Sequence, residues 1–242
     1  MKPEIIIALD YSKISGIKNI VNSLGDAINF YKIGLEAFIS VGKESLEFLK
    51  SLNKKIFLDL KLHDIPNTVK KASLAAAKIY GIDILSLHIQ GGVEMISETK
   101  KNLTNACLDK SKTPLLFGIT ILTSLDDSYL KNFRINCKNI QGYVVHLATI
   151  GKNAGLDGVV CSVGEASFVK QLCGSTFKII CPGIRLDRSR TNDQKRVYTP
   201  IDAKLAGADY IVMGRSITES LDPKETIEKI IGDLKDEDGR SD

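Results

Sequence analysis

The strongest chemical signal in the sequence is a run of alternating charges in residues 57–68, which read Phe-Leu-Asp-Leu-Lys-Leu-His-Asp-Ile-Pro-Asn-Thr. Side chains alternate between the two faces of a strand, so Asp59 and Lys61 should point to one side and the leucines to the other. Buried charges are unfavourable unless they are paired, and a pair near a strand end can face a cavity. The run therefore predicts an ion-paired site followed by Asp64 in a loop, although the pair could also merely fix the strand end.

Two more charged residues favour a catalytic site over a structural ion pair. Asp10 ends the first apolar run of the chain, and Lys32 lies inside the second, in Tyr-Lys-Ile-Gly. Lysines and aspartates that converge on one mouth form a cluster of alternating charges, which shifts pKa values and is typical of catalytic sites. The sequence thus indicates one cluster that joins Asp10 and Lys32 to the Asp59–Lys61 pair.

A second signal is a pair of glycine–arginine motifs late in the chain. Residues 181–185 read Cys-Pro-Gly-Ile-Arg, and residues 212–216 read Val-Met-Gly-Arg-Ser. Glycine allows close approach of backbone N–H groups to a phosphate, and arginine offers a fork for its oxygens. The motifs predict a phosphate site, although Gly183 and Gly214 could instead serve tight turns beside solvated arginines.

Hydroxyl and histidine side chains are weaker signals. Thr123 and Ser124 could bind the ring atoms of a ligand, or they could only cap the next segment. His63 is more typical of a hydrogen-bonded structural residue than of a general base, whereas His88 could support the site from the end of a strand. The three histidines are not at metal-ligand spacings, so no metal site is expected.

Short apolar runs that alternate with segments of helical periodicity must position these residues. Strands are expected at Glu4–Asp10, Phe30–Gly34, Lys55–Lys61, Asp83–His88, Leu115–Leu122, Gly158–Cys161, Phe177–Pro182 and Tyr210–Gly214. Helices are expected at Ser12–Leu24, Gly42–Leu52, Asn67–Tyr80, Met95–Leu108, His146–Asn153, Gly164–Leu172, Thr199–Ala206 and Pro223–Leu234. Nearly continuous apolar runs are typical of parallel strands that are buried on both faces.

This alternation predicts one α/β domain over residues 1–242, a (β/α)8 TIM barrel with a polar tail from about residue 235. A doubly wound open sheet is the alternative, but no glycine-rich dinucleotide motif follows the first strand. Residues 126–142 are less regular and should form a loop with short helical pieces. In a TIM barrel the chemistry lies at the C-terminal ends of the strands, where the charged and glycine–arginine motifs fall.

Composition and charge narrow the function classes. Hydrophobic residues make up 43% of the chain, and no apolar run approaches the roughly twenty residues of a membrane span. The net charge of +4 is small and scattered, which does not indicate nucleic-acid binding. Five cysteines without a Cys-x-x-Cys pair, and no signal peptide, predict a cytoplasmic protein with free thiols.

In their order along the chain, these motifs resemble those of the orotidine 5′-phosphate decarboxylase family, in its compact bacterial, single-function form. The signature is Asp59-x-Lys61-x-x-Asp64 with its His-Asp-Ile-Pro-Asn-Thr continuation. Other matching landmarks are Ala8-Leu9-Asp10, Lys32-Ile33-Gly34, Leu122-Thr123-Ser124, residues 158–162, Pro182-Gly183-Ile184-Arg185, residues 192–194 and Gly214-Arg215-Ser216. The resemblance extends from Ile5 to about Pro223.

The resemblance implies a homodimer with active sites at the interface, to which the neighbouring subunit contributes Asp64, Ile65 and Thr68. The implied catalytic residues are Lys61, Asp59, Asp64 and Lys32. The implied substrate-binding residues are Asp10 on the ribose, Thr123 on the pyrimidine, and Lys32, Asp59, Ile65, Thr68, Pro182, Arg185, Gln194, Gly214 and Arg215. Residues 188–191 would belong to a lid over the phosphate end.

The implied reaction is loss of CO2 from C6 of the orotate ring of orotidine 5′-phosphate, which gives UMP in pyrimidine biosynthesis. No π-acceptor delocalises the C6 carbanion, so Lys61 would stabilise it as an ammonium and then give it a proton. Asp59 would lie near the substrate carboxylate, where repulsion could destabilise the ground state. No metal or organic cofactor is implied.

The nearest alternative is a Mg²⁺-dependent sugar-phosphate lyase of the same superfamily, of the keto-gulonate phosphate decarboxylase or hexulose phosphate synthase type. Those enzymes share a similar Asp-x-Lys-x-x-Asp strand but work through an enediolate. The continuation after Asp64 and the Leu-Thr-Ser sequence argue against them. An alternative from another class is a non-catalytic phosphate-binding barrel. Such a protein should have lost a member of the charged network, yet Lys32, Asp59, Lys61 and Asp64 are all present.

Overall fold

The computed structural model describes residues 2–106, 113–186 and 198–236. Eight parallel strands close into a barrel in sequence order, and the first strand pairs with the last. The strands are β1 Glu4–Ala8, β2 Phe30–Ile33, β3 Lys55–Leu62, β4 Ile84–His88, β5 Leu115–Ile119, β6 Gly158–Val160, β7 Lys178–Cys181 and β8 Tyr210–Met213. This topology confirms the predicted (β/α)8 TIM barrel.

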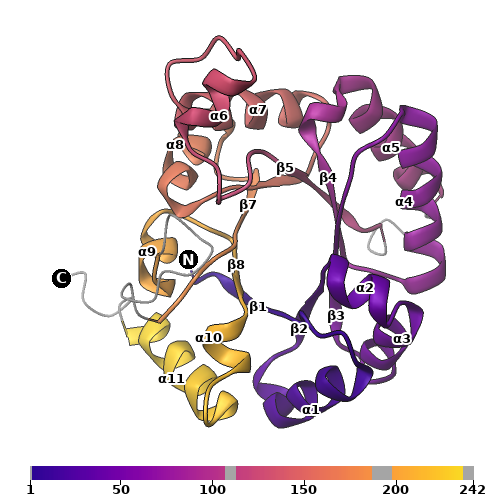
Figure 1. The fold of residues 1–242 in the computed structure, drawn as a ribbon, viewed down its shortest axis with the longest axis vertical. Coiled ribbons are helices and arrows are strands. Elements are labelled where there is room, and N and C mark those ends of the chain that lie inside the picture. Colours follow the sequence, from indigo (N-terminus) through magenta and orange to yellow (C-terminus); the bar gives the residue numbers. More distant parts are fainter. Residues whose placement is uncertain (1, 107–112, 187–197, 237–242) are drawn as a thin grey trace.

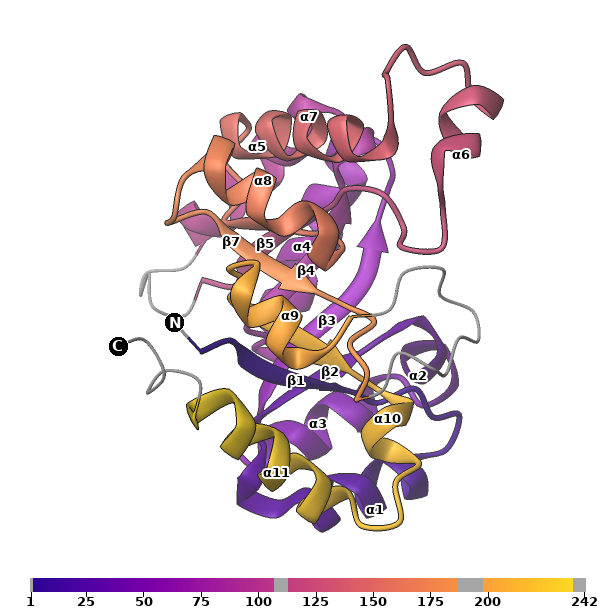
Figure 2. The ribbon, with the colours of Figure 1, turned by 90° about the vertical axis from the view of Figure 1, so that its left-hand side faces the viewer.

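Helices surround the strands on the outside of the barrel (Figure 1). They are α1 Ile14–Leu24, α2 Leu35–Ser40, α3 Lys43–Ser51, α4 Pro66–Tyr80, α5 Val93–Ala106, α6 Asp127–Asn132, α7 Ile140–Asn153, α8 Val163–Cys173, α9 Pro200–Leu205, α10 Arg215–Thr218 and α11 Pro223–Asp236, with 3-10 turns η1 Gly25–Ala27 and η2 Ile89–Gly91. The connection that carries α6 projects away from this ring (Figure 2). In the described part of the chain, no helix has the length and apolar character needed to cross a membrane.

Several helix boundaries differ from the prediction. Helix α4 begins at Pro66 after an Ile65 N-cap, one residue before the predicted start at Asn67, because proline has a fixed φ that suits the first helical position. Helix α7 begins at Ile140, six residues before the predicted start, where the Asn139 side chain accepts a hydrogen bond from Gly142 N–H at 2.9 Å. The predicted short helical piece in residues 126–142 is α6.

Other differences concern short elements and the end of the chain. The prediction missed α2 and α10, which follow β2 and β8 and are only 6 and 4 residues long. Such short helices contain too few turns to show helical periodicity in a sequence. The predicted polar tail begins inside the last helix, because α11 continues to Asp236, and the rest of the tail lies outside the described residues.

The barrel interior is packed with side chains. Alternate residues of the strands point inward and form one buried cluster, which consists of Ile6, Ala8, Phe30, Phe57, Ile84, Phe117, Ile180 and Val212. The Tyr210 ring packs edge-on against Phe30 and Phe117, with ring centroids 6.0 Å apart in both pairs. A second, larger cluster fills the space between the strands and the helices. The interior cluster therefore makes the barrel a packed core and not a pore.

Aspartates close the N-terminal end of the barrel in a repeated pattern. A Gly-x-Asp sequence precedes β4, β6 and β8, and each aspartate accepts a backbone N–H from the preceding odd-numbered strand. Asp83 accepts from Ile56 at 2.8 Å, and Asp157 and Asp209 accept from β5 and β7 at 2.7 Å. These bonds tie neighbouring strands together at the end opposite to the predicted chemistry.

Candidate active site

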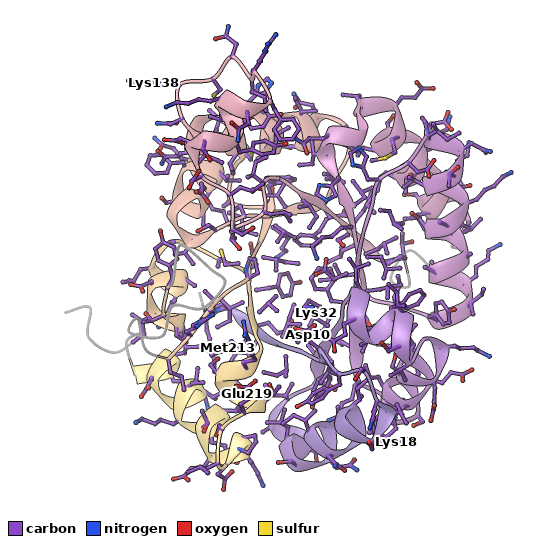
Figure 3. All side chains as sticks on the ribbon, viewed as in Figure 1. Asp10, Lys18, Lys32, Lys138, Met213 and Glu219 are labelled. Atoms are coloured by element: carbon purple, nitrogen blue, oxygen red, sulfur yellow. The ribbon has the colours of Figure 1, made fainter. Side chains whose placement is uncertain are left out.

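The carboxylate of Asp59 is the centre of a charged cluster at the C-terminal end of the barrel. Its Oδ2 lies 2.6 Å from Lys61 Nζ and 3.9 Å from Lys32 Nζ. Lys32 Nζ also lies 3.2 Å from Asp10 Oδ1, and Figure 3 shows these two residues side by side at the barrel wall. Asp59 is buried, so its charge depends on these partners. The structure thus brings four predicted residues into one series of alternating charges.

An irregularity in β3, rather than simple strand alternation, brings Asp59 and Lys61 together. Leu58 pairs with Leu85 and Leu62 pairs with Leu87, so three residues of β3, numbers 59–61, lie opposite Ser86 alone. Lys61 has a φ of +52°, a left-handed conformation that few residues other than glycine adopt. Bulges of this kind re-aim side chains and are frequent beside active sites. The sequence prediction was right about the pairing and wrong about its cause.

Gly34 leaves space for the contact between Lys32 and Asp10. A Cβ atom at this position would lie 2.8 Å from Lys32 Nζ and 3.3 Å from Asp10 Oδ1. A larger side chain at this position would therefore displace the end of the Lys32 side chain. In the Lys-Ile-Gly motif, the missing Cβ atom of the glycine thus makes room for the lysine head and the Asp10 carboxylate.

A cavity of about 270 Å³ opens beside the cluster. Lys32, Asp59 and Lys61 form its charged wall, and Thr123 and Ser124 after β5 add hydroxyl groups. The remaining lining is mostly apolar and consists of Phe57, Ile119, Ile121, Leu122, Val160, Cys161, Ile180, Pro182 and Val212. A small apolar pocket with a few converging polar groups is typical of a small-molecule site.

A second cavity, of about 440 Å³, is lined by Asp10, the member of the charged cluster that does not line the first cavity. Two of the predicted phosphate residues, Gly214 and Arg215, line it at the end of β8 and the start of α10. Its other lining residues are Ala8, Tyr11, Glu36, Thr218 and Glu219. The sequence reasoning missed Glu36 and Thr218 because it missed the two short helices that carry them.

The loop after β7 contains the other predicted phosphate residues. Gly183 has a φ of +75°, and the backbone N–H of Arg185 donates to Tyr198 O at 3.0 Å, which anchors the loop. Pro182 lines the smaller cavity, whereas Arg185 is half-buried and lines neither cavity. The predicted residue Gln194 and the predicted lid at residues 188–191 lie outside the described residues.

The residues expected to act across a dimer interface are exposed. Asp64 and Thr68 are exposed, and Ile65 is 66% exposed despite its apolar side chain. Asp64 Oδ1 accepts a hydrogen bond from Ile65 N–H at 2.7 Å. Within the residues that the structure describes, Asp64 has no ion pair with either lysine of the cluster. This chain alone therefore does not bring Asp64 to the other three charges.

The two histidines near the cluster lie beside each other. The His63 and His88 rings are 5.4 Å apart, and neither residue lines a cavity. Burial lowers the pKa of His88 from its usual value, and the charges of His63 and Lys61 lower it further. His88 Nδ1 is buried and has no hydrogen-bond partner among the described groups. These features favour a neutral His88.

Among the residues that the structure describes, no group of three or more His, Cys, Asp or Glu side chains could hold a metal ion.

The sequence reasoning also missed Ser86, which contacts two members of the cluster. Its Oγ donates a hydrogen bond to Asp59 Oδ1 at 2.7 Å and accepts one from Lys61 N–H at 3.0 Å. The only signal in the sequence was a polar residue within the apolar run Ile-Leu-Ser-Leu-His.

Comparisons with known proteins agree with this site. The model of the orotidine 5′-phosphate decarboxylase / HUMPS family matches residues 3–230. A protein of Idiomarina loihiensis named orotidine 5′-phosphate decarboxylase is 42% identical over 229 residues, which cover 95% of this chain and 96% of the relative. A protein of Geobacter metallireducens with the same name is 38% identical over 233 residues, which cover 96% of both chains.

A solved structure is also similar over nearly the whole chain. The crystal structure of orotidine 5′-phosphate decarboxylase from Lactobacillus acidophilus superposes with a TM-score of 0.84 at 36% identity, covering 97% of this chain and all of that one. Sequence similarity, barrel topology and the arrangement of charges thus lead to the same assignment. The chain belongs to the orotidine 5′-phosphate decarboxylase / HUMPS family.

Proposed function

We propose that this protein decarboxylates orotidine 5′-phosphate to UMP in pyrimidine biosynthesis, through the charged cluster at the C-terminal end of its barrel. The family match and the names of its relatives support this activity. The observation that carries the mechanism is the buried Asp59 carboxylate, which lies 2.6 Å from an ammonium group on the wall of a small cavity. This arrangement suits a reaction that develops negative charge without a neighbouring acceptor group.

The substrate would lie across the two cavities. Its pyrimidine ring fits the smaller cavity, where the Thr123 and Ser124 hydroxyls can bind the polar edge of the ring. The ribose would lie near Asp10 and Lys32, and the phosphate would lie near Arg215 and the loop after β7. In TIM barrels the loops after the seventh and eighth strands frequently bind phosphate, which supports this orientation.

The chemical step breaks the bond between C6 and the carboxylate, and the electron pair stays on C6 as CO2 leaves. The Lys61 ammonium stabilises the developing carbanion and then donates a proton to it, which leaves UMP and a neutral amine. Solvent returns a proton to the amine before the next turnover. Lys61 has the access that this cycle needs, because its side chain is 29% exposed although the carboxylate beside it is 9% exposed.

Asp59 and Lys32 would hold Lys61 in place and shape the local field. Asp59 binds the ammonium at 2.6 Å and would also lie near the carboxylate that the substrate loses. Repulsion between the two carboxylates would ease as CO2 departs, so the carboxylate would favour the transition state over the bound substrate. Lys32 links Asp59 to Asp10 and would thereby couple the ribose contact to the reacting end.

A homodimer would complete the site. The partner's Asp64, Ile65 and Thr68 are proposed to enter the active site of this chain, and the exposure of these residues supports the proposal. The partner's Asp64 would add a fifth member to the series of alternating charges formed by Asp10, Lys32, Asp59 and Lys61. Isologous dimers are the commonest assemblies of soluble proteins, and each would contain two such shared sites.

The activity is tested by following the loss of absorbance when orotidine 5′-phosphate is added to the purified protein in the presence of EDTA. Turnover with excess chelator is the expected result. A parallel assay with hexulose phosphate or keto-gulonate phosphate and Mg²⁺ provides the control for the related lyases. Activity only in that second assay, from a well-folded preparation, would overturn the proposal.

A further inference from the structure

Ser86 is a buried polar residue of the barrel wall that the proposed chemistry does not yet use. It lies in the middle of β4 and is completely buried, between the large apolar neighbours Leu85 and Leu87. Buried hydroxyl groups are unfavourable unless they form hydrogen bonds. The surroundings of this serine therefore indicate what its hydroxyl does.

The hydroxyl compensates for the irregularity in β3. Because residues 59–61 all lie opposite Ser86, the regular backbone ladder between β3 and β4 is interrupted there. The N–H of Lys61 finds its acceptor in Ser86 Oγ, at 3.0 Å, instead of in a backbone carbonyl. A side chain of β4 thus satisfies a donor that the bulge would otherwise leave buried and unpaired.

The same hydroxyl orients the central carboxylate. Its proton is donated to Asp59 Oδ1 at 2.7 Å, while Asp59 Oδ2 faces Lys61 Nζ at 2.6 Å. The two carboxylate oxygens therefore have different partners, which fixes the rotation of the carboxylate about its last bond. These contacts form a closed ring. Ser86 binds the Asp59 carboxylate, Asp59 binds the Lys61 ammonium, and the backbone N–H of Lys61 binds Ser86.

We infer that Ser86 is a positioning residue of the decarboxylation, which holds the Asp59 carboxylate and the left-handed Lys61 backbone so that the ammonium points into the cavity. This inference rests on the proposed function. Ser86 does not line the cavity and would not touch the substrate, so it acts through Asp59 and Lys61. Its role requires a group that accepts and donates a hydrogen bond at once, which a hydroxyl does and a methyl group does not.

The test compares wild type with Ser86→Ala and Ser86→Thr. Loss of the hydroxyl should lower kcat by about tenfold to a hundredfold, because small displacements of catalytic groups have effects of this size. Binding of UMP, measured by calorimetry, should stay within about threefold of wild type, because β4 lies across the barrel from β8, which is followed by the Gly214–Arg215 motif. Ser86→Thr retains the hydroxyl and should keep kcat within about fivefold of wild type.

Ser73→Ala is the matched control. Ser73 is also a completely buried serine, but it lies on α4 and its Oγ has no hydrogen-bond partner among the described groups. The kcat of Ser73→Ala should stay within about twofold of wild type. If Ser86→Ala fails to fold, Ser86→Cys preserves the size of the side chain with a weaker donor and should lower kcat at least about fivefold.

Three results would overturn the inference while wild type remains active. They are a folded Ser86→Ala variant with kcat within about twofold of wild type, an equal loss in Ser86→Thr and Ser86→Ala, and a loss of UMP affinity as large as the loss in kcat. Absence of turnover in wild type would instead overturn the proposed function itself. The two failures are therefore distinguishable.

Discussion

At each end of the barrel, an aspartate on or beside a strand pairs with a lysine at a similar distance. At the N-terminal end, Lys100 Nζ lies 2.6 Å from Asp157. At the C-terminal end, Lys61 Nζ lies 2.6 Å from Asp59. The difference lies in the surroundings of each pair. Asp157 also accepts the N–H of a neighbouring regular strand, whereas Asp59 lies in a bulged strand and faces a cavity.

This difference shows how one pair of residue types can stabilise a fold or carry chemistry. The N-terminal pair joins helix α5 to the strands and sits on relaxed backbone, so its interaction free energy stabilises the folded state. The C-terminal pair includes a lysine with left-handed backbone, and strain of this kind is stored where function requires it. Charges that face a cavity are available to a substrate, whereas charges that tie strands together are not.

Replacement of the two lysines should separate these roles most clearly. Lys61→Ala should lower kcat by about 10⁴-fold or more, because it removes both the proton donor and the main electrostatic stabilisation of the carbanion. Its melting temperature should also fall, because the buried Asp59 carboxylate loses its closest ammonium partner. Lys100→Ala is the matched control and should keep near-normal kcat with reduced stability. Steady-state kinetics and thermal melting measure both, and an inactive, fully stable Lys100→Ala variant would contradict the contrast.

The C-terminal end should also depend on a second chain, unlike the N-terminal end. Lys61→Ala and Asp64→Ala are each expected to be nearly inactive alone. When the two variants are unfolded together and refolded, about a quarter of wild-type activity should return, because half of the random dimers contain one intact site of two. Lys61→Ala mixed in the same way with Asp59→Ala provides the control. Lys61 and Asp59 of any one site come from the same chain, so both sites of the mixed dimer remain defective and no activity should return. Equal activity in the two mixtures would argue against the shared site.

The aspartates should respond differently to loss of charge. Asp157→Asn should lower the free energy of unfolding by about 2 kcal/mol, because it weakens a partly buried ion pair and a strand contact together. Asp59→Asn should change that free energy by less than about 1 kcal/mol and lower kcat at least about a hundredfold. Urea unfolding and kinetics of both variants provide the comparison. A loss of unfolding free energy in Asp59→Asn as large as that in Asp157→Asn would remove the distinction between the two ends.

The smallest expected effect concerns His88 and pH. Burial lowers its pKa in the folded protein, electrostatic interactions with His63 and Lys61 lower it further, and Asp59 opposes this shift. Below the usual histidine pKa of about 6.5, the unfolded chain therefore binds a proton that folded His88 resists. The free energy of unfolding should fall as pH drops through about 6.5, and His88→Gln should reduce this dependence. Unfolding curves at several pH values measure it, and an unchanged dependence in the variant would exclude His88 as its source.

Much of this site was readable from the chain itself. Continuous apolar runs and helical periodicity predicted all eight strands and the barrel, and the charged motif, Lys32 and Asp10 were predicted to form one cluster. These predictions succeed because the apolar runs of buried strands and the cost of burying charge are visible in the local sequence. The glycine–arginine motifs were likewise visible, since their residue types alone suit phosphate.

Tertiary structure alone decided how these residues meet. The bulge that brings Lys61 to Asp59 depends on the register between β3 and β4, which no local pattern encodes. Ser86 gained its role only because that bulge faces it, and Gly34 gained its role only because two distant side chains pack over it. The sequence determined which charges are present and on which strands they lie. Closure of the barrel determined which charges became part of the scaffold and which were left facing a cavity, because only the packed fold sets their distances and their burial.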